Sequence, residues 1–158
     1  MVEQIIKKSQ FEERGTLFET GAPVTCSVSI DKVIAVGFGD GSLRLYKPDA
    51  EPVVVHAHNG VILSIAANES HIITGGQDGL FLKISPNGEI EEIYNFGTQW
   101  VDNVAAYGDM FLCSSGKNVY IWSGDNNKPK LLEHQSTIGG IAIDLSLIHI
   151  SEPTRRPK

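Results

Sequence analysis

Gly37-Phe-Gly-Asp-Gly-Ser-Leu-Arg-Leu-Tyr46 and Gly75-Gly-Gln-Asp-Gly-Leu-Phe-Leu-Lys-Ile84 are two versions of one pattern, 38 residues apart. A third version, Ser114-Ser-Gly-Lys-Asn-Val-Tyr-Ile-Trp122, keeps the same step, because Trp122 follows Ile84 by 38 positions. A second landmark repeats with it: His58-Asn-Gly-Val-Ile-Leu-Ser-Ile65 resembles His134-Gln-Ser-Thr-Ile-Gly-Gly-Ile141, two periods or 76 residues later. A fixed period of this length is typical of repeat proteins whose units stack on one another.

Each period contains four candidate strands joined by turns. In the second period, the mostly apolar run Val61 to Ala67 predicts a strand buried on both faces, and His71 to Gly75 predicts the next one. Asp78-Gly79 is a strong hairpin signal because these residues tolerate the positive φ of tight turns, and Leu80 to Ile84 then returns. Glu89 to Asn95 mixes acids with apolar residues, as an outer edge strand does. The period therefore predicts a four-stranded antiparallel meander and an all-β chain.

The repeat resembles the Trp-Asp (WD) repeat family of β-propellers, whose units are about 40 residues long. The residues that fill the family's His, Ser-Val, Ser/Thr-Gly, Asp-Gly and Trp places are His58, Ser64, Ile65, Thr74, Gly75, Asp78, Gly79 and Ile84. The resemblance implies a partial WD-repeat β-propeller: about three four-stranded antiparallel blades plus one inner strand of a fourth. It implies blades over about residues 22–58, 59–97 and 98–135, with the fourth starting at 136–144. In the N-terminal segment, 1–21, it makes Thr16 to Thr20 an outer strand that closes the ring against a last blade missing from this sequence.

The match to the family is incomplete. In the family, a His, a Ser or Thr, an Asp and a Trp form a buried hydrogen-bonded chain within a blade. The Trp-Asp dipeptide itself appears nowhere in this sequence; the second blade supplies His, Thr and Asp together, and the first has the acid without the His. We therefore expect a structural hydrogen-bond network, not acid-base chemistry, at His58, Thr74, Asp78 and Asp40.

The last fourteen residues, LSLIHISEPTRRPK (145–158), look like the translation of a sequencing-library adapter. They carry three cations against one acid in a chain that is otherwise acidic. We expect them to be non-native and the natural protein to continue beyond Asp144. Even so, the first six alternate and could pair as a strand beside Ile138 to Asp144. The alternative is a native strand, Leu145 to Ile150, whose residues alternate, followed by a basic tail. If the tail is non-native, we expect this chain to expose the face of its third blade and to self-associate.

Composition excludes several classes of partner. The 13 Lys and Arg against 19 Asp and Glu give a net charge of −6, so we expect no nucleic-acid partner. Apolar runs fall far below the roughly 18 residues that span a bilayer, and the N-terminus lacks the apolar core of a signal peptide. Cys26 and Cys113 match no Cys-x-x-Cys spacing. The sequence therefore predicts a cytoplasmic protein with no cofactor, no metal and no membrane partner.

Trp100 is the strongest candidate for partner binding. It aligns with Val61 and Thr137 at the mouth of the inner strand. By the resemblance, propellers present side chains to partners at this place on their top face. Exposed aromatic residues often dominate interface energetics, although packing against a neighbouring loop is an equal alternative. The candidate residues for this partner-binding surface are Trp100, Gln77, Lys117 and Phe38.

Two functional classes follow from these residues. The first is a non-enzymatic scaffold that binds a peptide or protein partner on the top face of the propeller. The alternative is a fragment of a propeller enzyme, of hydrolase or lactonase type, whose site lies in missing blades. Such chemistry needs ligands from several blades, and the inner strands offer only Asp102 and Asn103 as polar candidates. His56 and His58 have no third metal ligand nearby in sequence, so we favour the scaffold and predict no catalytic residue.

Overall fold

The computed structural model describes residues 14–124, 127–143 and 148–151. In these ranges the regular elements are fourteen β-strands, arranged as three four-stranded sheets and one two-stranded sheet, and the paired strands are antiparallel. No helix in the same ranges is long and apolar enough to cross a membrane. The all-β class predicted from the repeat is confirmed.

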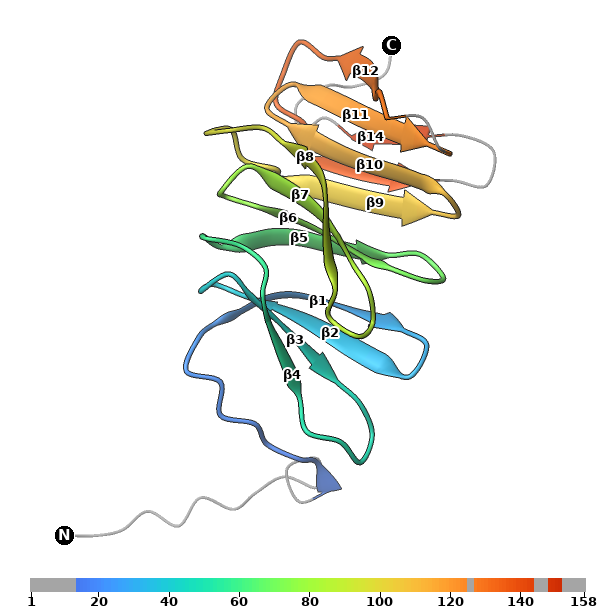
Figure 1. Cartoon of the computed structure of the whole chain (residues 1–158). Helices are drawn as coiled ribbons and strands as arrows, with labels where there is room; N and C mark the ends of the chain where they lie inside the picture. The colour runs from blue at the N-terminus through green and yellow to red at the C-terminus, as the bar shows by residue number, and fades with distance from the viewer. Residues whose placement is uncertain (1–13, 125–126, 144–147, 152–158) are drawn as a thin grey trace, which may run out of the picture.

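Each four-stranded sheet, or blade, is a meander in which the strands pair in chain order. Blade 1 consists of β1 (Val24–Ile30), β2 (Val33–Phe38), β3 (Ser42–Tyr46) and β4 (Val53–His56). Blade 2 consists of β5 (Ile62–Ala67), β6 (Ile72–Gly76), β7 (Leu80–Ile84) and β8 (Ile90–Asn95). Blade 3 consists of β9 (Asn103–Tyr107), β10 (Met110–Ser115), β11 (Asn118–Ser123) and β12 (Lys130–Glu133). The blades stack face to face along the chain (Figure 1).

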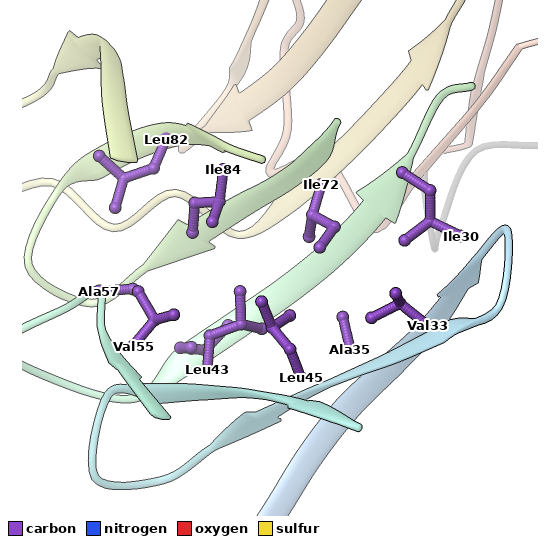
Figure 2. Close-up of a cluster of buried hydrophobic side chains, with 11 residues drawn as sticks. Ile30, Val33, Ala35, Leu43, Leu45, Val55, Ala57, Ile72, Leu82 and Ile84 are labelled. Atoms are coloured by element: carbon purple, nitrogen blue, oxygen red, sulfur yellow. The ribbon is translucent and has the colours of Figure 1, made fainter. Parts of the chain in front are cut away.

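The hydrophobic core lies between the blades. Alternation along β6 sends Ile72 toward blade 1 and its neighbour Ile73 toward blade 3, and both side chains are fully buried. The middle blade thus buries both of its faces. Figure 2 shows the cluster between blades 1 and 2, which consists of Ile30, Val33, Ala35, Leu43, Leu45, Val55, Ala57, Ile62, Ile72, Leu82 and Ile84.

A fourth unit follows blade 3 and has two strands, β13 (Gly140–Ile143) and β14 (Ile148–Ser151), which pair antiparallel. The sequence predicted the first of these as an inner strand, and the alternating residues at the start of the tail were expected to be able to pair beside it. β14 overlaps the alternative strand considered for Leu145 to Ile150, and it forms because those residues alternate beside an unpaired strand. A strand pairing carries no information about the origin of the residues. The remainder of the tail lies outside the described residues.

The face of blade 3 that was expected to be exposed is covered instead. Leu112, Val119 and Ile121 are buried with Ile138, which precedes β13 in the chain. Ile141 of β13 packs against the same cluster. The expectation was wrong because the fourth unit supplies enough apolar side chains to cover that face.

Residues Thr16 to Thr20 have no regular structure and lie against blade 1. The strand predicted for them was to close the ring against a last blade outside this sequence, so it stays a prediction. The Phe18 ring lies 4.9 Å from that of Tyr46, and Arg44 Nη2 donates a 2.8 Å hydrogen bond to the carbonyl oxygen of Thr20. A strand needs a neighbouring strand for its main-chain hydrogen bonds, and none of the described strands pairs with this segment.

Candidate functional site

Five loops meet at one end of the blades, on the left side of Figure 1. We call them the rim; they comprise residues 39–41, 57–61, 77–79, 96–102 and 116–117. Main-chain hydrogen bonds tie neighbouring loops together: the amide of His58 donates to the Gly41 carbonyl at 3.0 Å, and the amide of Phe96 donates to the Gly79 carbonyl at 2.8 Å. The rim is therefore a surface assembled from several blades and held by backbone contacts.

Behind the rim, blade 2 contains the hydrogen-bonded series that the family resemblance implies. His58 is 6% exposed. Its Nδ1 lies 2.8 Å from Asp78 Oδ1, and its Nε2 lies 2.8 Å from Thr74 Oγ1. An ionised carboxylate can only accept, so Nδ1–H donates to Asp78; in the neutral ring, Nε2 then accepts from the Thr74 hydroxyl. The series pins the β4–β5 loop to the β6–β7 turn.

Asp78 is held in its ionised form by this arrangement. Burial acts to raise the pKa of its carboxyl, but hydrogen bonds from His58 and from the amides of Asn59 and Leu80 outweigh that effect, and the pKa lies below its ordinary value. An ionised, fully bonded carboxylate is a structural acceptor. The pair therefore fits the predicted structural role.

Replacing Thr74 with valine tests the series. We expect a loss of about 1–3 kcal/mol in the free energy of unfolding, because the buried Nε2 of His58 loses its partner while the side-chain shape is kept. Chemical denaturation followed by circular dichroism measures the loss. Thr137→Val, at an exposed position, is the control and should change stability by less than about 0.5 kcal/mol. Equal effects in the two variants would contradict a structural role for the series.

Asp40 lies in blade 1, where the sequence supplies the acid without a His, and it makes a local set of bonds apart from the series of blade 2. Its Oδ1 accepts hydrogen bonds from the Ser42 hydroxyl at 2.6 Å and from the Ser42 amide at 2.9 Å, and these bonds lower the pKa of its carboxyl. Its Oδ2 lies 3.7 Å from Arg44 Nη2. Thr20 stands one period before His58, so blade 1 closes its turn with this local cluster instead of a His-containing series.

Blade 3 has neither the series of blade 2 nor the cluster of blade 1, and a third set of hydrogen bonds holds it. Asn103 Nδ2 donates to Ser114 Oγ at 2.9 Å and to the carbonyl of Ile138 at 3.3 Å. Burial raises the pKa of Asp102, and a hydrogen bond from the Gly116 amide partly opposes the rise. The two polar residues considered for an enzyme site therefore both make bonds that join blade 3 internally or to the fourth unit. In the described ranges, no three His, Cys, Asp or Glu residues gather as a metal site.

The four partner-binding candidates separate into two groups. Trp100 and Lys117 are exposed on the rim, and Gln77, in another rim loop, is partly exposed. Phe38, by contrast, is 1% exposed, so its prediction as a rim residue was wrong. Its place next to the turn indicated exposure, but the Arg44 guanidinium lies over its ring, 4.3 Å from the centroid, and covers it.

Packing and hydrogen bonds of neighbouring residues hold the backbone at Trp100 in place. The next residue, Val101, is fully buried against the backbone of Gly75, where an added Cβ would lie 2.6 Å from a Val101 methyl carbon. The Ser115 hydroxyl donates to the Trp100 carbonyl at 2.8 Å, and the Asp102 amide donates to the Ser114 carbonyl at 3.0 Å. The Trp100 side chain is nevertheless 52% exposed. Ile62 and Ile138 are the buried counterparts of Val101, which agrees with the alignment of Trp100 with Val61 and Thr137.

An aromatic cluster between blades 2 and 3 was missed from the sequence. Phe81 and Trp122 have ring centroids 5.3 Å apart, and Phe96 meets Tyr120 edge to face at 4.8 Å. Tyr94 lies 4.7 Å from Phe96. The sequence feature that could have revealed the cluster is two pairs of aromatic residues spaced i, i+2, one pair from each blade. Side chains spaced in this way along a strand point to the same face of its sheet. The cluster supports the β8–β9 loop that carries Trp100.

No protein-family model and no curated protein matches the sequence. Solved structures do match the fold. The computationally designed Ika4 protein has a TM-score of 0.72 and 14% identity, over 87% of this chain and 90% of its own. U3-55K has a TM-score of 0.69 and 17% identity, over 79% and 44%. The computationally designed Ika8 protein has a TM-score of 0.69 and 12% identity, over 80% and 42%.

The chain is a partial β-propeller. Its three stacked meanders and the match to U3-55K together carry this conclusion, and identities this low concern the fold alone. The chain spans less than half the length of Ika8 and of U3-55K. The repeat period therefore led to the correct architecture, although no sequence comparison finds a relative.

Proposed function

We propose that this partial propeller is a non-enzymatic scaffold that binds a peptide or protein segment through the rim, with Trp100 as its anchor. The observation that carries the proposal is the contrast between the Trp100 side chain, 52% exposed, and its backbone, fixed by buried Val101 and by Ser115. An exposed aromatic on rigid backbone loses little conformational freedom on binding, which favours affinity. Gln77 and Lys117 complete the surface.

The charges of the rim favour a neutral or basic partner segment. The described rim residues include three acids, Asp40, Asp78 and Asp102, against one lysine, Lys117, and the whole chain carries a net charge of −6. Complementary charge speeds encounter and excludes like-charged partners. We therefore infer an uncharged or Lys/Arg-containing segment as the ligand, and no nucleic acid.

The same proposal places the chain in the WD-repeat family and in the cytoplasm. The series from Asp78 through His58 to Thr74 and the 38-residue period support the family assignment. Cys26 and Cys113 are free thiols, as is usual in a reducing compartment. Burial raises the pKa of both thiols, so neither has the lowered pKa of a reactive cysteine.

The variant Trp100→Ala tests the scaffold proposal. We expect it to fold like the wild type, since its side chain is half exposed, and to lose partner binding by about thirtyfold, or ~2 kcal/mol. Tyr107→Ala is the matched control, because Tyr107 is 56% exposed at the opposite end of β9. Partners recovered by immobilised wild type and by each variant are compared, with far-UV circular dichroism to verify folding. Equal recovery by wild type and Trp100→Ala would reject the site, and loss of fold would make Trp100 a packing residue.

A further inference from the structure

The outer part of the junction between blades 2 and 3 carries a continuous strip of large apolar side chains. The ring of Phe96 lies 4.7 Å from that of Tyr94 on β8 and 4.8 Å from that of Tyr120 on β11, centroid to centroid. Leu131 pairs with Tyr120 across β11 and β12, so these two side chains share one face of blade 3. Tyr94 and Leu131 are each 44% exposed. Phe96 and Tyr120 are partly exposed. We call these four residues the tyrosine strip.

A β-bulge brings Tyr94 into the strip. Phe81 stands one period after Leu43, and each pairs with a residue on the fourth strand of its blade. The partner of Leu43 is Val55, which is 7% exposed in the core between blades 1 and 2. The partner of Phe81 is Tyr94, because the register of β7 with β8 shifts between Phe81 and Leu82. Bulges re-aim side chains and are over-represented beside functional sites. The bulge thus sets a large exposed aromatic where the preceding junction buries a valine.

The blade 3 side of the strip also differs from the preceding junction. Leu82 stands one period before Tyr120, faces blade 1 and is 2% exposed. It pairs with Glu92, which is exposed, whereas Tyr120 pairs with the exposed Leu131. Blades 2 and 3 both have apolar clusters on their two faces, so the strip is not the uncovered face of an end blade. The stacking of blades therefore does not account for these exposed side chains.

The chemistry of the strip suits an extended segment that is rich in proline. Asn118 Nδ2 donates to the Tyr120 hydroxyl oxygen at 3.4 Å, so the hydroxyl proton can donate in turn. A polyproline II helix has no internal hydrogen bonds, and its carbonyl groups can accept from such a donor. Protein domains that recognise proline-rich segments do so on surfaces lined by aromatic side chains. Glu133, which is exposed and pairs with Asn118, favours a lysine or arginine at that end of the segment.

We propose that the tyrosine strip binds a proline-rich segment of a partner protein in the polyproline II conformation, with a basic residue of the segment near Glu133. A polyproline II helix is already formed before it binds, so it loses little conformational freedom in the complex. The strip is a second site on the chain, and the proposal requires no role for Trp100 in the rim.

Fluorescence anisotropy with a labelled oligoproline peptide that ends in arginines tests the proposal. A glycine-serine peptide with the same arginines is the matched probe, and we expect the oligoproline peptide to bind about tenfold more tightly or better. Tyr94→Val, which copies the preceding junction, should weaken its binding by about tenfold or more, and so should Leu131→Ser. Glu133→Gln should weaken it by about two- to fivefold, the usual effect of one exposed charge pair. Tyr107→Val is the control, because Tyr107 is 56% exposed at the end of β9, outside the strip.

Four outcomes would overturn the site. The first is no saturable binding of the oligoproline peptide. The second is equal binding of the two peptides, which would make charge the sole attraction. The third is equal weakening by Tyr107→Val. The fourth is loss of peptide binding in Trp100→Ala, which would place the peptide on the rim. Circular dichroism verifies the folding of each variant, and Leu131→Ser decides the matter if Tyr94→Val does not fold. Partners that Trp100→Ala loses should still be recovered by Tyr94→Val, which separates failure of this proposal from failure of the rim.

Discussion

Replacing Phe81 with alanine is expected to lower the free energy of unfolding by about 3–5 kcal/mol, the usual cost of truncating a fully buried phenylalanine. Phe81 is 0% exposed at the junction of blades 2 and 3 and lies 5.3 Å from Trp122, centroid to centroid. Its strand, β7, is hydrogen-bonded on both sides, so the surroundings cannot collapse into the vacated space. The loss should therefore fall at the upper end of the range for core truncations.

Urea denaturation followed by intrinsic tryptophan fluorescence measures the effect, since Trp122 reports directly on this junction. Tyr94→Ala is the matched control: Tyr94 belongs to the same aromatic cluster, but it is 44% exposed. We expect it to cost about 1 kcal/mol. If both truncations had the same cost, burial between blades would not be the source of the stability.

Gly79→Ala is the second substitution with a large expected effect, of about 3 kcal/mol or more, because backbone strain and a steric clash add together. Gly79 has a φ of +81°, where a side chain is strained. An added Cβ would also collide with the carbonyl oxygen of Gly97 and lie 3.0 Å from that of Gln99. Backbone atoms cannot move aside as a flexible side chain can, so the β8–β9 loop must shift. Because that loop carries Trp100, we expect partner binding to weaken together with stability.

Gly108→Ala separates the effect of backbone strain from that of the steric clash. Gly108 also has a positive φ, +56°, but a Cβ added to it would meet nothing within 4 Å. Its substitution should cost only the strain of the left-handed conformation, about 1–2 kcal/mol. Thermal unfolding of the two variants gives the comparison. Equal shifts in melting temperature would mean that the contact between the β6–β7 turn and the β8–β9 loop contributes nothing.

The local sequence pattern was sufficient to predict the strands and their order. Leu80 to Ile84 was predicted with the bounds that β7 has, because a turn pair precedes it and its residues suit a buried strand. The 38-residue period then extended this one meander to the other blades, since equal spacing of turns gives equal strands. The candidate pairings of His58 with Thr74 and Asp78 followed from the family resemblance, and the distances in the structure agree.

Contacts between residues that are distant in the sequence decided which side chains are buried, and the local sequence pattern could not predict these contacts. Phe38 sits beside a turn, as a rim residue would, yet Arg44 covers its ring. The aromatic cluster was missed for the same reason, because Phe81 and Trp122 meet only when two blades stack.

Ile34 and Ile72 show which properties the sequence determines and which depend on the tertiary structure. One period separates them, both lie on the second strand of a blade, and the sequence by itself determined that each is a strand residue with one side facing along the stack. Only the tertiary structure decided that Ile72 is 0% exposed and Ile34 is 53% exposed. The physical reason is that hydrogen bonds and turns depend on neighbouring residues within a blade, whereas burial depends on whether another sheet lies against that face.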